Sequence, residues 1–448
     1  MGQSLIQAAA LSAAIFGLSG CLADTNKGSF VSRLKSPDAG LAVKESGPKT
    51  TAFASTASTY DDKLNSESNV INGLVARRSA LPNGSAYDQV TSAVLAANVR
   101  SAESELRSAR LRAEAAGTNW LPTIGPSISL TSLSDVIVNF VVDQVLFDNG
   151  RKKGEREFAK ADVEVAAVAL AQDTNDRAAT GLELYLAAAE GREKASLAET
   201  TLEDMARFEY IMSERVRGGV SDMSDLNIIR QKLSEIHAAQ TAGRETTRSA
   251  IAELNAMSVQ PLQGVRGLTK LKVSATDAQP LKVTKAEAEM TREIAAAKID
   301  RASQLPGVSL SGTVGKNSNI GVKAGGAQFG LGTGARLKAI EIAKETAGRR
   351  VSQANEDSNR ALRKLESQIA AKTRQASEAT NLTAQAKNNL DLFQAQYKAG
   401  QRQVMDVVGV YQTFSKAQEA EVTLKYEAAT LRVEMARILG VLADGDLI

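Results

Sequence analysis

The feature that most limits how this chain can fold is an internal repeat that begins near residue 86. Two Ala-rich blocks with helical periodicity follow one another, and each is interrupted by an insert that begins at a proline, residues 122–147 and 306–331. The two inserts have the same length. Within each insert the apolar residues change from helical spacing to alternation, with a polar turn in the middle. The repeat therefore predicts two β-hairpins, each placed between helices.

Each insert has room for two strands of about ten residues, which is the length that a tilted transmembrane β-strand requires. A two-stranded hairpin leaves backbone groups unpaired at its edges, and lipid does not tolerate such groups. We therefore expect the four strands of one chain to close a barrel together with other copies of the chain. The alternative is a soluble hairpin at the end of a coiled coil. The least regular strand is the fourth, where alternation slips near Gly325 and Gly326.

The lengths of the helical segments indicate how they pack. Residues 148–217 and 335–399 each predict an uninterrupted helix, and the first of these would be about 100 Å long. Shorter segments at 86–120 and 223–257 together match the first long helix, as 284–304 and 403–439 match the second. We expect the short helices to stack end to end against the long ones. The predicted fold class is mainly α with a transmembrane β-barrel, in two repeats (86–257 and 284–448) joined by a connector (258–283).

The N-terminal residues predict a lipid anchor. Residues 1–20 contain an apolar run of signal-peptide length that ends in Leu18-Ser19-Gly20-Cys21, which resembles the bacterial lipobox. Cys21 would then be acylated, and Leu22 after it, rather than Asp, implies delivery to the outer membrane. Residues 21–85, rich in Ser, Thr, Gly and Ala, predict a flexible tether. The alternative is a chance apolar leader with a buried cysteine.

The composition excludes most enzyme classes. One Cys and one His, His237, leave no material for a cysteine-based zinc site or a multi-histidine metal centre. We expect neither enzymatic activity nor a cofactor, and we expect His237 to be a surface or packing residue. With 54 Lys and Arg against 51 Asp and Glu, and no basic block, the sequence gives no support to nucleic-acid binding.

Each repeat also contains one glycine turn between two helical segments. Gly218 and Gly219 form the first turn, and Gly219 aligns with Gly400 of the second. Downstream of each glycine, Asp225 aligns with Asp406. Glycine permits the positive φ angle that ends a helix, and the polar residues that follow can cap the next one.

Together these features resemble the TolC-like outer-membrane efflux proteins over residues 87–440. The resemblance is carried by Leu-Pro pairs at 121–122 and 305–306, by Leu-Phe-Asp-Asn-Gly-Arg at 146–151, and by Tyr-Lys-Ala-Gly at 397–400 with Asp-Val at 406–407. It implies a homotrimer with a 12-stranded outer-membrane barrel and a 12-helix periplasmic tunnel. It also implies a passive exit duct that works with a periplasmic adaptor protein, which docks at the turns of Gly218, Gly219 and Gly400, and with an inner-membrane pump.

The resemblance further implies a gate at the periplasmic tip. In the family, an arginine of the second turn is linked to hydroxyl and acidic groups of the first turn, with a tyrosine nearby. The matching residues are Arg402, Ser224, Asp225 and Tyr397, and Asp406 matches an acidic ring at the constriction. A second acidic ring of the family falls at Gly409 in this chain, which puts cation selectivity in doubt. The alternative for Arg402 and Asp225 is an ordinary solvated pair.

Three functions therefore remain open at the level of sequence. The first is the outer-membrane duct of a tripartite system that exports small molecules. The second, within the same family, is the duct of a type I protein or peptide secretion system. The third belongs to another class and is a lipid-anchored periplasmic coiled-coil scaffold without a pore.

Overall fold

Two long helices form the main body of the chain. The computed structural model describes residues 68–97, 101–132, 135–314, 318–325, 330 and 332–447. Within these ranges, helix α5 (Arg151–Arg217) has 67 residues and helix α8 (Thr333–Lys398) has 66. Each is therefore about 100 Å long. The prediction of two long helices is confirmed.

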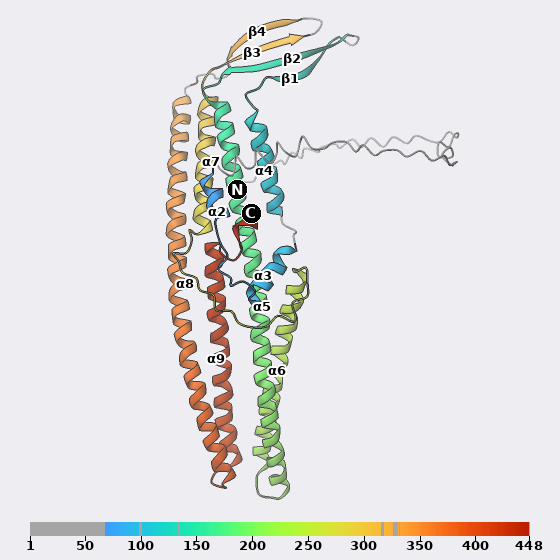
Figure 1. Cartoon of the computed structure of the whole chain (residues 1–448), viewed down its shortest axis with the longest axis vertical. Helices are drawn as coiled ribbons and strands as arrows, with labels where there is room; N and C mark the ends of the chain where they lie inside the picture. Colours follow the sequence, from blue (N-terminus) through green and yellow to red (C-terminus); the bar gives the residue numbers. More distant parts are fainter. Residues whose placement is uncertain are drawn as a thin grey trace, which may run out of the picture. The chain divides into compact units, whose positions relative to one another are not determined.

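Shorter helices lie along the two long ones, as the segment lengths predict. Helices α3 (Ala86–Ala96), α4 (Ser101–Gly117) and α6 (Met223–Ala256) contact α5, whereas α7 (Leu281–Ser303) and α9 (Val404–Leu439) contact α8. Both α7 and α9 also contact α5, so they join the first repeat to the second (Figure 1). None of the helices in the described ranges combines the length and the hydropathy that are needed to cross a membrane.

One predicted helix is divided in two. The sequence predicts a continuous helix over residues 86–120, but α3 ends at Ala96 and α4 begins at Ser101. The carbonyl groups at the end of α3 find partners outside the helix. The guanidinium group of Arg177 on α5 donates to the carbonyl oxygens of Val94 at 3.0 Å and Ala97 at 3.1 Å. These tertiary hydrogen bonds replace the helical ones and favour the break at this position.

The predicted tether is shorter than residues 21–85. Helix α2 (Asn69–Val75) is capped by Ser68, whose side chain accepts a hydrogen bond from the amide of Ile71 at 3.2 Å. Arg77 donates to the carbonyl oxygens of Leu439 and Gln279, which ties this segment to the end of α9 and the start of α7. Residues 68–85 therefore belong to the packed structure. Residues 1–67, with Cys21, lie outside the described residues.

The two inserts form one antiparallel sheet with the strand order β1-β2-β3-β4. The strands are β1 (Thr123–Ser132), β2 (Asp135–Phe147), β3 (Gly307–Val314) and β4 (Asn319–Gly325). Hydrogen bonds between β2 and β3 join the hairpins of the two repeats. The predicted hairpins are thus confirmed, and β4 ends at Gly325, where the sequence alternation slips. Strands β1 and β4 are the edges of the sheet.

The register separates apolar from polar side chains on the two faces of the sheet. Phe140 on β2 lies opposite Pro126 on β1 and Val314 on β3, so these residues share one face. The exposed large apolar residues of this face are Ile124, Val138, Phe140, Leu310, Val314, Ile320 and Val322. The opposite face is mainly polar and carries Asn139, Asp143, Ser309, Ser311, Thr313 and Lys323. Within the described chain nothing covers the apolar face, because its large side chains remain exposed.

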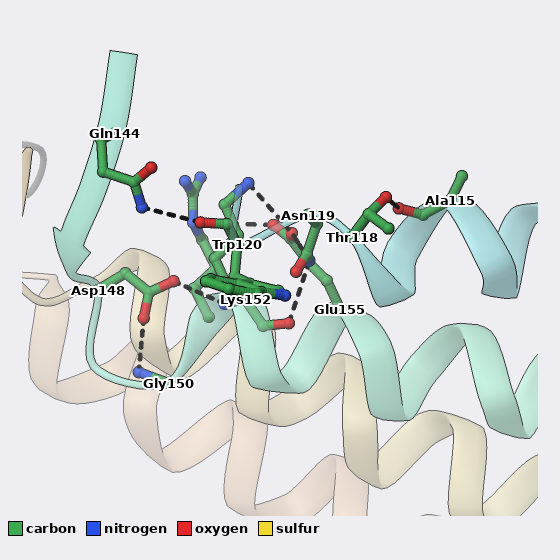
Figure 2. A network of polar contacts seen from close by, with 10 residues as sticks. Ala115, Thr118, Asn119, Trp120, Gln144, Asp148, Gly150, Lys152 and Glu155 are labelled. Carbon is green, nitrogen blue, oxygen red and sulfur yellow. Dashed lines mark hydrogen bonds and ion pairs between the residues drawn. The ribbon is translucent and has the colours of Figure 1, made fainter. Parts of the chain in front are cut away.

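A polar network joins the sheet to the helices (Figure 2). The side chain of Asn119, after α4, donates to the carbonyl oxygen of Lys152 at 3.1 Å and to Glu155 at 2.9 Å. The side chain of Gln144 on β2 donates to the carbonyl oxygen of Trp120 at 2.8 Å. Asp148 accepts from the backbone amide of Lys152 at 2.6 Å and so caps the start of α5. The connection between strand and helix is therefore fixed on both sides of the hairpin.

Helices α5 and α6 approach closely at a pair of glycines. An added Cβ at Gly243 would lie 2.7 Å from the carbonyl oxygen of Gly191, and one at Gly191 would lie 2.8 Å from the carbonyl oxygen of Gly243. The hydroxyl group of Thr247 donates to the carbonyl oxygen of Ala188 across the same crossing at 3.2 Å. Small residues at this point allow the backbones of the two helices to come together.

Candidate gate at the paired glycine turns

The two glycine turns have the same backbone structure and lie at the end of the helices opposite the sheet (Figure 1). Gly219 has φ 72° and Gly400 has φ 74°. The residue after each glycine donates its amide hydrogen to a carbonyl five residues earlier, Val220 to Arg215 and Gln401 to Gln396, both at 2.9 Å. This pattern is a Schellman motif, in which the glycine occupies the left-handed position. Both glycines are therefore required by backbone geometry.

Gly218 has a different conformation from Gly219. Its φ is −81° and its ψ is 0°, and its counterpart in the second turn is Ala399 with φ −80° and ψ 0°. A side chain is therefore tolerated at this position of the turn. The structure therefore does not require glycine at position 218, although the sequence counts Gly218 among the residues of the docking turns.

An apolar cluster near the turns holds the two helical hairpins together. It is built from the ends of α5, α6, α8 and α9, and its buried members are Met205, Phe208, Met212, Leu226, Ile229, Leu390, Val404, Val407, Val408 and Tyr411. The ring of Tyr411 meets the rings of Phe208 and Phe414 edge to face, with centroid distances of 6.4 and 6.2 Å. The tips of the first and second repeats therefore pack against each other within one chain.

A buried polar link crosses this cluster. The hydroxyl group of Tyr411 on α9 donates to Asp204 Oδ2 on α5 at 2.7 Å. Burial and the hydrogen bond to this carboxylate raise the pKa of Tyr411 above its usual value. The sequence analysis did not identify this pair, because 207 residues separate its members and no local pattern connects them. This hydrogen bond of Tyr411 therefore connects the second repeat to the first near the tip.

Arg402 contacts its own repeat in this chain. Its Nε donates to Gln396 Oε1 at 3.1 Å, and its guanidinium carbon lies 4.5 Å from the centroid of the Phe393 ring. Both partners are on α8. Among the described residues, the structure places no contact between Arg402 and the predicted partners Ser224 and Asp225 within a single chain. A link between neighbouring subunits stays a prediction.

The other predicted gate residues lie in the first or last turns of their helices. Asp406 accepts a hydrogen bond from the backbone amide of Gln403 at 3.2 Å, in a capping box at the start of α9. Asp225 is in the first turn of α6, where its charge complements the helix dipole, and Ser224 beside it is exposed. Tyr397 packs partly buried against the apolar cluster. Asp406 and Asp225 therefore each have a local structural role at a helix start.

The described residues contain no group of His, Cys, Asp and Glu side chains arranged to hold a metal ion. His237, on α6, is exposed, which selects the surface position from the two that the sequence left open, surface or packing.

The sequence matches no family model and no curated protein. Solved structures with the same arrangement exist, however. A membrane protein from Pseudomonas aeruginosa is 16% identical, with a TM-score of 0.69 over 80% of this chain and 91% of that one. The CmeC outer membrane channel of Campylobacter jejuni is 13% identical, with a TM-score of 0.66 over 80% and 86%. The open state of the MtrE outer membrane channel of Neisseria gonorrhoeae is 14% identical, with a TM-score of 0.67 over 83% and 96%.

These similarities cover most of each chain, although sequence identity is low. They agree with the resemblance noted in the sequence. The chain therefore has the fold of the TolC-like outer-membrane efflux channels.

Proposed function

We propose that this protein is the outer-membrane channel of a tripartite export system. Three copies would form a passive exit duct for small molecules, with the sheets in the outer membrane and the helices in the periplasm. A periplasmic adaptor protein would dock at the tips, and an inner-membrane pump would supply the energy. Cys21 would carry the lipid that anchors each chain to the membrane.

The observation that carries the proposal is the uncovered apolar face of the four-stranded sheet. In water this face would expose Phe140, Ile320 and other large side chains to solvent, which monomeric soluble proteins avoid. In a bilayer the same face would contact lipid, and the mainly polar face would line an aqueous lumen. The edges at β1 and β4 supply unpaired backbone groups that strands of neighbouring copies would satisfy. One requirement, a membrane-embedded oligomer, thus accounts for both features.

The tip would act as the gate of the duct. Arg402 stands in the turn between α8 and α9, where it has alternative partners: Gln396 and Phe393 of α8, or an acidic side chain such as Asp225 of a neighbouring subunit. A charge-assisted link across each subunit boundary would close the tip, and release of that link would open it. Asp406 of each copy would add negative charge to the constriction.

Conductance across a planar lipid bilayer tests this function. The reconstituted full-length protein is expected to give small conductance events in the closed state, and Arg402→Ser together with Asp225→Ala is expected to increase them. Arg363→Ser is a suitable control, because Arg363 is an exposed residue in the middle of α8 whose side chain forms an ion pair with Glu366, one turn along the same helix. If neither the wild type nor the double variant conducts, the pore-free scaffold becomes the better explanation.

The class of cargo needs a separate assay. Cells that lack the protein are expected to accumulate small amphiphilic compounds if it serves efflux. The alternative of a type I secretion duct predicts instead the loss of a secreted polypeptide, with unchanged accumulation of small compounds.

A further inference from the structure

The helix ends beside the sheet carry an excess of positive charge. These ends are the last turns of α4 and α7 and the first turns of α5 and α8, which meet the strands directly (Figure 1). Within about two turns of these ends, the basic side chains that form no ion pair in the described part of the chain are Arg110, Lys153, Arg156, Arg301, Arg336 and Lys338. We call this set the basic collar. Lys153, Arg301, Arg336 and Lys338 are exposed.

Part of the collar places positive charge at helix starts, where negative charge is usually favoured. The first turn of α5 and that of α8 contain no acidic residue, and instead carry basic residues, including Lys153 and Arg336. Positive charge at a helix N-terminus is unfavourable because the helix dipole is positive there. At the opposite tip the usual rule holds: Asp225 and Asp406 lie in the first turns of α6 and α9, and Lys398 ends α8. The unfavourable placement beside the sheet is thus that of the starts of α5 and α8, whereas Arg301 at the end of α7 is favourably placed.

Two acidic groups at the start of α5 are already engaged, and Glu114, Asp300 and Glu341 at the neighbouring helix ends form no ion pair with the collar in the described part of the chain. Both oxygens of Asp148 accept backbone amide hydrogens, from Gly150 at 3.0 Å and from Lys152 at 2.6 Å (Figure 2). Glu155 accepts from Asn119 and lies 3.9 Å from Lys152. Among the described residues the exposed charges of the collar form no ion pair with a carboxylate, so a negatively charged partner from outside would relieve their repulsion.

An exposed apolar rim lies next to the collar on the side of the sheet. It consists of Trp120 and Leu121 before β1 and of Leu146 and Phe147 at the end of β2, each exposed by between 45% and 58%. Figure 2 shows that Trp120 directly adjoins the start of α5. Trp and Phe side chains next to Lys and Arg are typical of the boundary between hydrocarbon and headgroups in membrane proteins. An amphiphile with an apolar tail and an anionic head would complement both parts.

We propose that the basic collar binds the headgroups of anionic phospholipids in the membrane leaflet that faces the helices. The inference rests on the proposed function, which places the sheet in a bilayer, and it adds the lipid class that the protein selects. Acyl chains would pack on the rim at Trp120 and Phe147, and the phosphate oxygens would accept hydrogen bonds from Lys153, Arg301, Arg336 and Lys338. Attraction between a basic surface and anionic lipid falls off within a Debye length, so it is sensitive to salt.

A matched pair of triple variants tests the proposal. The collar variant is Lys153→Glu, Arg301→Glu and Arg336→Glu. The control variant, Arg363→Glu, Lys364→Glu and Arg374→Glu, makes the same change in charge at exposed positions in the middle of α8. Each full-length protein is reconstituted into vesicles with equal amounts of dioleoylphosphatidylglycerol and dioleoylphosphatidylcholine, then extracted gently, and the co-purified lipids are measured by mass spectrometry.

We expect the wild type and the control variant to retain phosphatidylglycerol preferentially. The collar variant is expected to lose this preference by about fivefold or more, the factor expected for one basic residue at an anionic surface. Higher salt should reduce the preference of the wild type in the same direction. Equal lipid ratios for the wild type and the collar variant would overturn the proposal, as would an equal loss in the control variant.

Conductance in pure phosphatidylcholine bilayers separates this inference from the proposed function. A collar variant that conducts like the wild type but retains no excess of phosphatidylglycerol supports both the channel function and the binding of anionic lipid by the collar. If the wild-type protein conducts but shows no preference between the lipids, the binding of anionic lipid by the collar is contradicted and the channel function is still supported. Protein that neither inserts nor conducts contradicts the channel itself.

Discussion

The close contact between α5 and α6 allows a quantitative prediction for Gly243→Ala. The new Cβ would lie 2.7 Å from the carbonyl oxygen of Gly191, 3.1 Å from the amide nitrogen of Ala195 and 3.2 Å from its Cβ. Two of these partners are backbone atoms, so the helices must separate. Overpacking of this kind costs about 1–3 kcal/mol, and replacement of a helical glycine by alanine returns about 0.5–1 kcal/mol. We expect a net loss of about 0.5–2 kcal/mol in the local free energy of unfolding.

Hydrogen exchange measured by mass spectrometry reports this local stability. Peptides that cover residues 185–195 and 240–250 are expected to exchange about 2 to 30 times faster in Gly243→Ala, which follows from the free-energy range above. Gly348→Ala is the control, because Gly348 lies within α8 and an added Cβ there has nothing within 4 Å. This variant is expected to exchange more slowly around position 348, since it gains helix propensity without a clash.

The two substitutions thus predict opposite signs for the same chemical change. Slower or unchanged exchange at the crossing of α5 and α6 in Gly243→Ala would refute the argument, because it would mean that the helices separate without cost. An acceleration that is equally large in Gly348→Ala would also contradict it, since that result would indicate a general effect of the substitution.

Further predictions concern the tip and the break between α3 and α4. Gly219→Ala is expected to destabilise the first turn by about 1–2 kcal/mol because of its positive φ, whereas Gly218→Ala should be nearly neutral; protease cleavage rates at the turn measure the difference. Tyr411→Phe removes the hydrogen bond to Asp204, leaves a partly buried carboxylate oxygen without this partner and should speed hydrogen exchange in α9 by about fivefold or more. Because the pKa of Tyr411 is raised, folding keeps its phenol protonated, so tip stability should fall as pH rises above about 10 in the wild type and less in Tyr411→Phe. Arg177→Met removes the donor at the end of α3 and should lower the thermal midpoint; an unchanged midpoint would contradict its capping role.

Local patterns in the sequence were sufficient for the four strands, the two long helices and their order. Pro122 and Pro306 end helices because proline lacks an amide hydrogen, and the alternation after each proline selects strands. Gly219 and Gly400 end helices because only glycine adopts a positive φ without strain. The lengths of the segments between these signals then limited the packing to short helices beside long ones. Each of these determinants acts within a few residues, which is why one sequence reveals it.

Contacts between distant residues required the tertiary structure. Arg177 stabilises the break that divides residues 86–120 into two helices. Residues 68–85 are held in the packed structure by Arg77, which donates to the carbonyl oxygen of Leu439 near the C-terminus. The link between Tyr411 and Asp204 likewise follows from how α5 and α9 pack. Such contacts form only when folding brings remote segments together, because the hydrogen-bonding capacity of a side chain does not specify its partner. The sequence by itself thus determined the strands, the long helices and the turns of this protein, and the packing of its helices decided the break between α3 and α4, the position of residues 68–85 and the hydrogen bonds between the repeats.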